Sequence, residues 1–386
     1  MEQNGKRPHI RLDAGLQWAV SAKRPHALNG HSPTLALVDL FCGCGGLTLG
    51  AWEAARRSGC RLSIQFALDW SAKALDVYRT NFGCSADICI QSNVEDVLSE
   101  IGKPLTSVER RLRKSSGVVN LVVAGPPCQG HSDLNNSSRR KDPRNVLYLK
   151  VVRAAEVFRP NAVLIENVPT VIHDSDNVVP RAVSVLEQLG YEVDQQIVSL
   201  VKLGIPQTRR RHLLVATKKE RFDIREFVEL LEAKPATAGQ FLRGLEDEPK
   251  RLPEPFYQPS RPTAENTERI RYLFDNDIHD LPNARRPPCH RDKQHAYVSM
   301  YGRMYWDRPA QTLTSGFGSM GQGRFVHPTR PRLITPHEAA RLQGFPDYFD
   351  FTMVESVTAL REMIANAVPP PLAIAFVSEF IRRKLV

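Results

Sequence analysis

Short apolar runs alternate with amphipathic stretches along the first half of the chain. The amphipathic stretch 47–59 ends at Gly59, as a helix would. Strands that alternate with helices of this length predict βαβ units and a mostly parallel sheet, covered by helices on both faces. We therefore expect an α/β fold. The apolar runs that we interpret as its strands include residues 35–41, 61–69, 117–125 and 161–167.

The hydrophobic pattern weakens after Lys219 and becomes regular again near Pro309. The intervening residues are rich in proline, arginine and other charged residues, and the first residues of the chain are polar and interrupted by prolines. We predict an N-terminal extension at 1–34 that is flexible, an α/β core at 35–219, an irregular insert at 220–308 and a return segment at 309–386 that completes the core.

Composition and charge narrow the class of protein. Lys+Arg minus Asp+Glu is 52 − 42 = +10 over 386 residues, which favours a polyanionic partner but also suits an ordinary basic enzyme. The 7 cysteines are an odd number in a chain too long for a disulfide scaffold, so we expect reduced thiols. No apolar run approaches the roughly 20 residues that span a bilayer, and the N-terminus lacks the apolar region of a secretory signal. We expect a soluble intracellular protein.

A glycine cluster follows the first predicted strand in DLFCGCGGLTLG (39–50) and opens a helix. Glycines permit a tight turn and a close approach to a ligand, and the helix supplies free N–H groups. Asp69 ends the next predicted strand, where an acidic residue would bind ribose hydroxyls in a nucleoside-binding α/β fold. The alternative is that Asp69 caps the helix that begins near Ser71.

Three further motifs place reactive groups near strand ends. Cys128 of GPPCQGHS (125–132) and Glu166 of ENV (166–168) follow or end apolar strands, at the sheet edge where α/β proteins bind ligands. Burial there would raise the pKa of Glu166 and let it donate a proton. Arg209 and Arg211 alternate as they enter a strand, so both should face the same side and meet an anion or a carboxylate. The remaining cysteines are interpreted as inert buried thiols.

The ordered set FCGCGG, GPPCQGHS, ENV, QTRRR, RPAQTLTS, HEAARLQGFPD and NAVPP resembles that of the cytosine-C5 DNA methyltransferases, in their bacterial form. The resemblance runs from about Leu35 to the end of the chain and leaves only the insert unmatched. It implies a Rossmann-like core that depends on S-adenosylmethionine and a small, irregular target-recognition domain at 220–308.

The resemblance also assigns roles to residues. Cys128 is implied as the nucleophile, Glu166 as the contact to N3 and the exocyclic amine of cytosine, and Arg209 and Arg211 as supports of the base and the active-site loop. Asn93 stands where the family usually has an aspartate, and its oxygen can accept equally well from the adenine amine. The positions implied to bind S-adenosylmethionine are Phe41, Gly43, Gly45, Gly46, Asp69, Trp70, Asn93, Val94, Pro127, Leu147, Asn366 and Ala367.

The implied reaction needs a cytosine that has been flipped out of duplex DNA. Addition of the Cys128 thiolate to carbon 6 makes carbon 5 nucleophilic enough to take a methyl group. Loop 128–145 would close over the DNA, and arginines of the insert suit phosphates or guanine edges. No metal is expected, because Cys289, His290 and His295 lack a fourth ligand. The candidate DNA contacts are Gln129, Ser132, Arg139, Arg140, Lys141, Arg285, Arg286 and Arg291.

Other functions stay open at this point. They are a tRNA cytosine-5 methyltransferase, an inactive DNA-binding regulator on the same fold, and a dinucleotide-dependent oxidoreductase. The last lacks the spaced G-x-G-x-x-G pattern. The expected setting is a monomeric, nucleoid-associated enzyme of the bacterial cytoplasm that acts on double-stranded DNA without a membrane, in a restriction-modification or epigenetic context, with a cognate restriction endonuclease as a possible partner.

Overall fold

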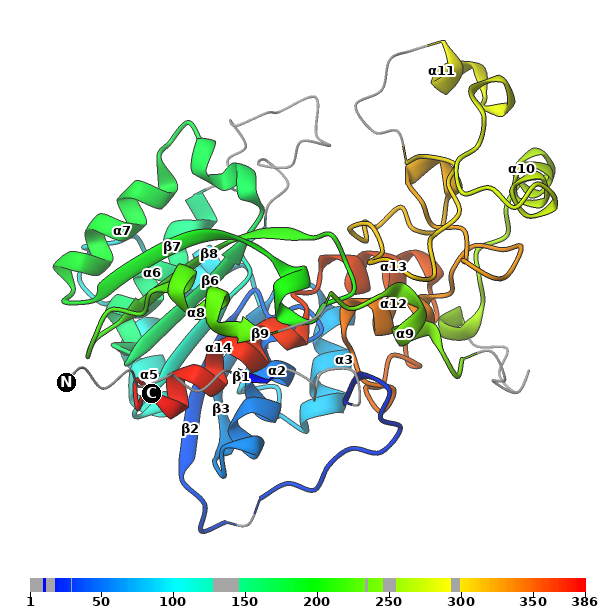
Figure 1. Ribbon diagram of the computed structural model, residues 1–386. Helices are drawn as coiled ribbons and strands as arrows, with labels where there is room; N and C mark the ends of the chain where they lie inside the picture. Colours follow the sequence, from blue (N-terminus) through cyan, green and yellow to red (C-terminus); the bar gives the residue numbers. More distant parts are fainter. Residues whose placement is uncertain are drawn as a thin grey trace, which may run out of the picture.

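A seven-stranded sheet in the order β4-β3-β2-β5-β6-β8-β7 lies at the centre of the larger lobe (Figure 1). The computed structural model describes residues 10–11, 18–28, 30–127, 146–232, 235–245, 255–292 and 299–386. Neighbouring strands from β4 to β6 are parallel, whereas β8 is antiparallel to both β6 and β7. This confirms the predicted α/β class and its mostly parallel sheet. The strands are β2 (Thr34–Leu40), β3 (Arg61–Asp69), β4 (Cys89–Gln91), β5 (Leu121–Ala124), β6 (Ala162–Asn167), β7 (Glu192–Ser199) and β8 (Arg210–Thr217).

Alternate side chains of the central strands enter two separate apolar layers. Leu121 and Val123 of β5 pack under α2 (Gly46–Arg57), α8 (Ile224–Leu230) and α14 (Pro370–Arg382). Val122 and Ala124 pack on the other face. The helices of that second layer are α4 (Val94–Val97), α5 (Ser107–Ser116), α6 (Leu147–Phe158) and α7 (Val178–Gln188). Two-sided burial explains why these strands are apolar throughout.

A second lobe beside the sheet has its own apolar cluster (Figure 1). It combines helices from the predicted insert with helices from the predicted return segment, since α12 contacts both α9 and α13. The predicted boundaries at 219 and 309 stay predictions. The lobe's helices are α9 (Ala238–Leu242), α10 (Ala264–Asp275), α11 (Pro288–Arg291), α12 (Pro336–Gln343) and α13 (Val357–Asn366), with short turns η4 (Pro255–Tyr257), η5 (Asn283–Arg285) and η6 (Met320–Gln322).

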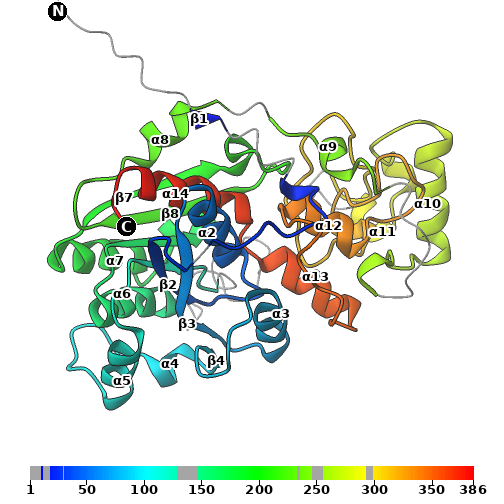
Figure 2. The same cartoon turned by 90° about the horizontal axis from the view of Figure 1, so that it is seen from below.

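Part of the N-terminal extension packs against both lobes. Strand β1 (Ile10–Arg11) pairs with β9 (Leu231–Glu232), and Trp18 is buried edge-on against Tyr348. Further along, the Arg24 guanidinium lies 4.9 Å from the ring centre of Trp52 in α2. Figure 2 shows this blue segment running from the second lobe toward α2. Trp18 and Arg24 thus contact other parts of the fold, and the flexibility of the extension stays a prediction.

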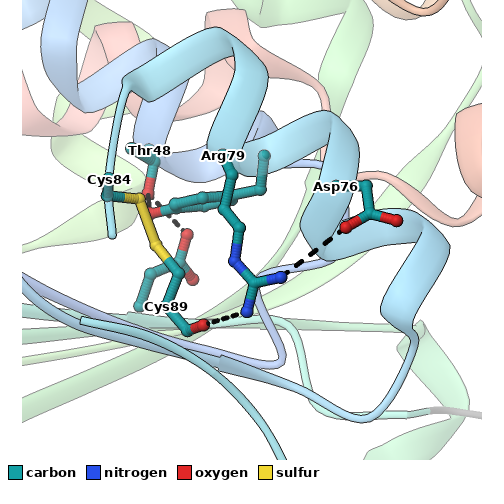
Figure 3. Close-up of a disulfide and its surroundings, with 7 residues drawn as sticks. Thr48, Asp76, Arg79, Cys84 and Cys89 are labelled. Carbon is teal, nitrogen blue, oxygen red and sulfur yellow. Dashed lines mark hydrogen bonds and ion pairs between the residues drawn. A yellow bond between two sulfur atoms is a disulfide. The ribbon is translucent and has the colours of Figure 1, made fainter. Parts of the chain in front are cut away.

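The cysteines differ from the sequence-based expectation. Cys84 and Cys89 form a disulfide between the end of α3 (Ala72–Phe82) and β4 (Figure 3). The expectation of reduced thiols is wrong for both, and Cys289, expected to be buried, is exposed. The cause lies in local geometry: the short loop after α3 returns directly to the sheet and brings the two side chains together.

One stretch of the described residues, Val357–Arg382, is long and apolar enough to cross a membrane by length and composition alone. It comprises α13 and α14, and 83% of its most apolar window is buried within the protein. Phe376 and Phe380 of this stretch pack against Phe222. Packing in the core accounts for its hydropathy.

Candidate active site and glycine loop

Several candidate site residues lie at the carboxyl edge of the sheet. Because β2, β3, β5 and β6 are parallel, the glycine loop (41–46), Asp69, Pro127 and Glu166 follow or end strands at the same edge. Pro127 is the last described residue before a gap at 128–145. The candidates that lie outside the described residues are Cys128, Gln129, Ser132, Arg139, Arg140 and Lys141.

Glu166 forms a largely buried ion pair with Arg211. The Arg211 Nε lies 2.6 Å from the Glu166 Oε1, and the two side chains are 12% and 8% exposed. The antiparallel register of β6 and β8 allows this contact. Glu166 is opposite Leu213, and Arg211, two residues before Leu213, is on the same face of the sheet. The other carboxyl oxygen of Glu166 faces Gly125, three residues before Cys128, at 3.9 Å from the position of a Cβ there. A carboxylate and a guanidinium thus lie together beside the loop that carries the candidate nucleophile.

Arg209 has other interaction partners than Arg211. Its guanidinium is buried and donates to the carbonyl oxygens of Leu313 and Ala365, at 3.3 Å each. It thereby connects the start of β8 to the end of α13, directly before Asn366. The predicted meeting with a carboxylate is observed for Arg211, whereas Arg209 bonds to backbone carbonyls. The catalytic role predicted for Arg209 stays a prediction.

Gln207, the first residue of the QTRRR motif but not one of the predicted site residues, supports the same junction. Its amide nitrogen donates to the Leu342 carbonyl at 2.8 Å, and its oxygen accepts from the Leu313 N–H at 3.0 Å. This residue is fully buried. Its place two residues before the candidate arginines, in the same motif, is the signal that would have pointed to it.

The glycine loop has left-handed backbone at Phe41 (φ 56), Gly43 (φ 53) and Gly45 (φ 97). The Gly43 N–H donates to the Asp69 Oδ2 at 2.9 Å. Helix α2 begins at Gly46 without a side-chain cap, which leaves N–H groups of its first turn available to a ligand.

Asp69 is not the cap of α3. Ser71 is the N-cap, with its hydroxyl accepting from the Ala74 N–H, and the Asp69 Oδ1 accepts from the Ser71 N–H at 2.9 Å. Each carboxyl oxygen therefore accepts from at least one backbone N–H. Burial raises the pKa of Asp69, although the backbone donors counteract this. The neighbouring Trp70 is 75% exposed and offers an aromatic face beside the loop.

The remaining candidate cofactor residues come from other elements. Asn93 precedes α4 and its side chain makes no cap bond, and Val94 is buried. Leu147 begins α6. Asn366 and Ala367 end α13, and a Cβ at Gly46 would overlap the carbonyl oxygen of Val368. This close approach brings the end of α13 to the glycine loop.

A buried polar network beneath the loop was not predicted from the sequence. Asp39, Thr48 and Tyr78 are fully buried, and burial raises the pKa of Asp39 to about 8. Burial also raises the pKa of the Cys42 thiol, with the charges of Asp39 and Asp69 adding to the effect, which suits an inert cysteine. The signal was an aspartate inside the apolar run LALVDLF.

The candidate arginines of the insert lie on the second lobe. The Arg285 guanidinium is 4.6 Å from the ring centre of Tyr272, and the Arg286 Nε donates to the Leu281 carbonyl at 3.1 Å. Arg291 pairs with Asp292. Within the described ranges, no group of three or more His, Cys, Asp or Glu residues could hold a metal ion. His295 lies outside those ranges.

The arrangement defines a class of protein: an α/β enzyme with a nucleoside-type loop and an acid–guanidinium pair at one sheet edge. The sequence model of the C-5 cytosine-specific DNA methylase family matches residues 35–382. The chain belongs to this family, as the resemblance predicted, and it is a DNA (cytosine-5) methyltransferase.

Individual relatives agree with this assignment. The chain is 44% identical over 341 residues to the Type II methyltransferase M1.BsuMI of Bacillus subtilis, covering 88% of this chain and 79% of the relative. It is 29% identical to the Type II methylase M.HgiDII of Herpetosiphon aurantiacus, covering 87% of this chain and 92% of the relative.

Solved structures share the fold. A DNA modification methyltransferase encoded within an E. coli prophage matches with a TM-score of 0.61 at 25% identity, covering 90% of this chain and 99% of that one. The S. pombe Dnmt2 methyltransferase matches with a TM-score of 0.62, covering 91% of this chain and 100% of that one. At 16% identity, the latter likeness concerns the fold alone.

Proposed function

We propose that the enzyme methylates carbon 5 of a flipped-out cytosine in double-stranded DNA, with S-adenosylmethionine as donor and Cys128 as covalent nucleophile. The observation that carries this proposal is the Glu166–Arg211 ion pair beside Gly125, at the sheet edge that also holds the glycine loop. An acid–guanidinium pair there can bind the edge of a pyrimidine and move a proton.

The residues divide the chemistry as follows. The Cys128 thiolate forms a bond to carbon 6, and Glu166 hydrogen-bonds to N3 or protonates it, so the ring becomes enamine-like. Arg211, in its ion pair with Glu166, lies where its charge can stabilise negative charge that develops on the base. S-adenosylmethionine supplies the electrophilic methyl group. A base, which water can supply, then takes the carbon-5 proton, the electrons of that bond form the carbon 5–carbon 6 double bond, and the bond from carbon 6 to the Cys128 sulfur breaks. A proton placed on N3 returns to Glu166.

The glycine loop and its neighbours fit the donor. Asp69 would accept from the ribose hydroxyls, and the exposed Trp70 would lie against the adenine ring. The Asn93 side chain, which makes no cap bond, would accept from the adenine amine. Phe41, Gly43, Gly45, Gly46, Val94, Pro127, Leu147, Asn366 and Ala367 complete the proposed site.

The DNA would be held by loop 128–145 and by Arg285, Arg286 and Arg291 of the second lobe. The formal net charge of +10 supports a polyanionic partner. We further propose a monomer in the bacterial cytoplasm, associated with the nucleoid and paired with a restriction endonuclease for the same site. The Type II names of the relatives support this setting.

The test is transfer of labelled methyl from S-adenosylmethionine to duplex DNA and, separately, to tRNA. We expect labelled DNA with the wild type, unlabelled tRNA, and no transfer with Cys128→Ala. Label in tRNA alone would refute the proposed substrate, and an active Cys128→Ala variant would refute covalent catalysis. Bisulfite sequencing of the product then identifies the methylated cytosine.

A further inference from the structure

A chain of buried hydrogen bonds lies directly beneath the glycine loop. The Asp39 Oδ2 is 2.6 Å from the Thr48 Oγ1, and that hydroxyl is 2.9 Å from the Tyr78 phenol oxygen. Asp39 is in β2, Thr48 in the first turn of α2 and Tyr78 in α3. The chain thus ties together the three elements around the loop. Figure 3 shows Thr48 in the same close-up as the Cys84–Cys89 disulfide.

The Thr48 hydroxyl joins the two ends of this chain. It forms one hydrogen bond with the Asp39 carboxyl group and a second one with the Tyr78 phenol. The other carboxyl oxygen of Asp39 is buried and has no hydrogen-bond partner among the described residues, which makes the carboxylate depend on Thr48. Loss of the Thr48 hydroxyl would leave two buried polar groups without their bond.

Tyr78, the last member of this chain, also packs directly against the glycine loop. Gly45 packs so closely on two rings that a Cβ there would overlap Phe82 and lie 2.9 Å from Tyr78. The Tyr78 and Phe82 rings are themselves in contact, with centres 4.6 Å apart. Cys42, at the other end of the loop, belongs to the same apolar cluster as Tyr78. Because Gly45 lies directly against the Tyr78 ring, a shift of that ring would move the loop relative to the sheet.

We propose that the Tyr78–Thr48–Asp39 chain is a positioning device for the methyl-donor site. It holds the glycine loop at the height at which the Gly43 N–H meets Asp69, and it thereby sets the affinity for S-adenosylmethionine. None of the three side chains needs to touch the donor. The inference rests on the proposed function, because it takes loop 41–46 as the donor's binding loop.

The test is equilibrium dialysis of labelled S-adenosylmethionine with the full chain, without DNA. Thr48→Val keeps the shape of the side chain and removes the hydroxyl, and we expect the Kd to rise about tenfold, as one lost hydrogen bond would cause. Thr48→Ser restores the hydroxyl and should return the Kd to within about twofold of the wild-type value. In steady-state assays, the KM for the donor should rise far more than kcat falls.

Tyr191→Phe is the matched control. Its buried phenol donates to the Pro160 carbonyl at 2.7 Å, in the same lobe but away from the loop. It should lower the melting temperature about as much as Tyr78→Phe, yet leave the donor Kd unchanged, whereas Tyr78→Phe should raise that Kd.

Equal donor Kd values for wild type, Thr48→Val and Tyr78→Phe would overturn the positioning role. An increase for Tyr191→Phe as large as that for Tyr78→Phe would also overturn it, since general destabilisation would then suffice. If Thr48→Val does not fold, the comparison of Tyr78→Phe with Tyr191→Phe decides alone. A wild type that binds no S-adenosylmethionine would instead refute the proposed function.

Discussion

At the scale of single residues, the proposed chemistry depends most directly on Glu166. Motif resemblance was enough to select both Glu166 and Arg211 as candidate site residues. Their contact could not be predicted, because it depends on β8 lying antiparallel beside β6 rather than on sequence spacing. For the same reason, the different position of Arg209 was not foreseen: its partners are backbone carbonyls of segments about 100 residues or more away along the chain.

Glu166→Gln removes the acid and keeps the shape of the side chain. We expect kcat to fall by about a hundredfold or more, the usual contribution of general acid catalysis, in the methyl-transfer assay. Asp194→Asn is a matched carboxyl-to-amide change in β7, where Asp194 accepts from the Ile224 N–H and pairs with Arg221. It should leave kcat unaffected. Equal losses in the two variants would argue against a chemical role for Glu166.

Asp39 should make stability depend on pH. Its pKa is raised by burial from 3.8 to about 8, so the folded protein keeps a proton that the unfolded chain releases. Its contribution to stability is therefore complete at low pH and is lost as pH rises toward 8. Asp39→Asn cannot ionise, so the melting temperature of the variant relative to wild type should increase from about pH 5 to about pH 9. A difference that is constant with pH would contradict the raised pKa.

At the scale of elements, local periodicity predicted β3 at the residues it occupies and β2 to within one residue. Packing between distant segments was not predictable in the same way. The N-terminal extension looks polar and proline-rich, yet the Trp18 side chain from its middle part is buried in the second lobe. The disulfide was hidden because an odd cysteine count says nothing about which two side chains meet.

Titration of free thiols tests the Cys84–Cys89 disulfide. Of the 7 cysteines, 7 − 2 = 5 should react with a thiol reagent in the denatured, unreduced protein. Cys84→Ser with Cys89→Ser should lower the free energy of unfolding by about 2 kcal/mol, as expected for a short closed loop. Cys60→Ser, at a free and partly exposed cysteine, is the control and should change it little. Seven reactive thiols would show that the bond does not form.

At the scale of the whole molecule, the excess of positive charge favours a polyanionic partner but does not separate that interpretation from an ordinary basic enzyme, and the motifs were needed to predict DNA. The arrangement of the second lobe was harder to predict from the sequence. Its helices α9, α12 and α13 come from both sides of the predicted boundary at 309 and meet in one cluster. Hydrophobic pattern marks which residues are buried, but not which distant segment covers them.

DNA affinity should fall steeply with salt, because bound arginines release counterions from phosphates. Removing Arg285 and Arg286 together by substitution with glutamine should reduce the slope of log Kd against log salt by up to about 2. Arg110→Gln on α5, in the larger lobe and exposed, should leave the slope unchanged. Fluorescence anisotropy with a labelled duplex at several salt concentrations measures both. An unchanged slope in the double variant would remove these arginines from the phosphate contacts.

The close packing of α14 on α2 has a consequence for when the enzyme can fold during its synthesis. Backbone of the segment 368–370 lies so near Gly46 and Gly50 that not even a methyl group would fit between them. The first helix after the glycine loop is therefore completed by a segment that the ribosome makes more than 300 residues later. Contacts of such long range form only after both partners have been synthesised. A nascent or prematurely terminated chain that lacks segment 368–370 would leave Gly46 and Gly50 without their packing partner, and the proposed donor site would be incomplete.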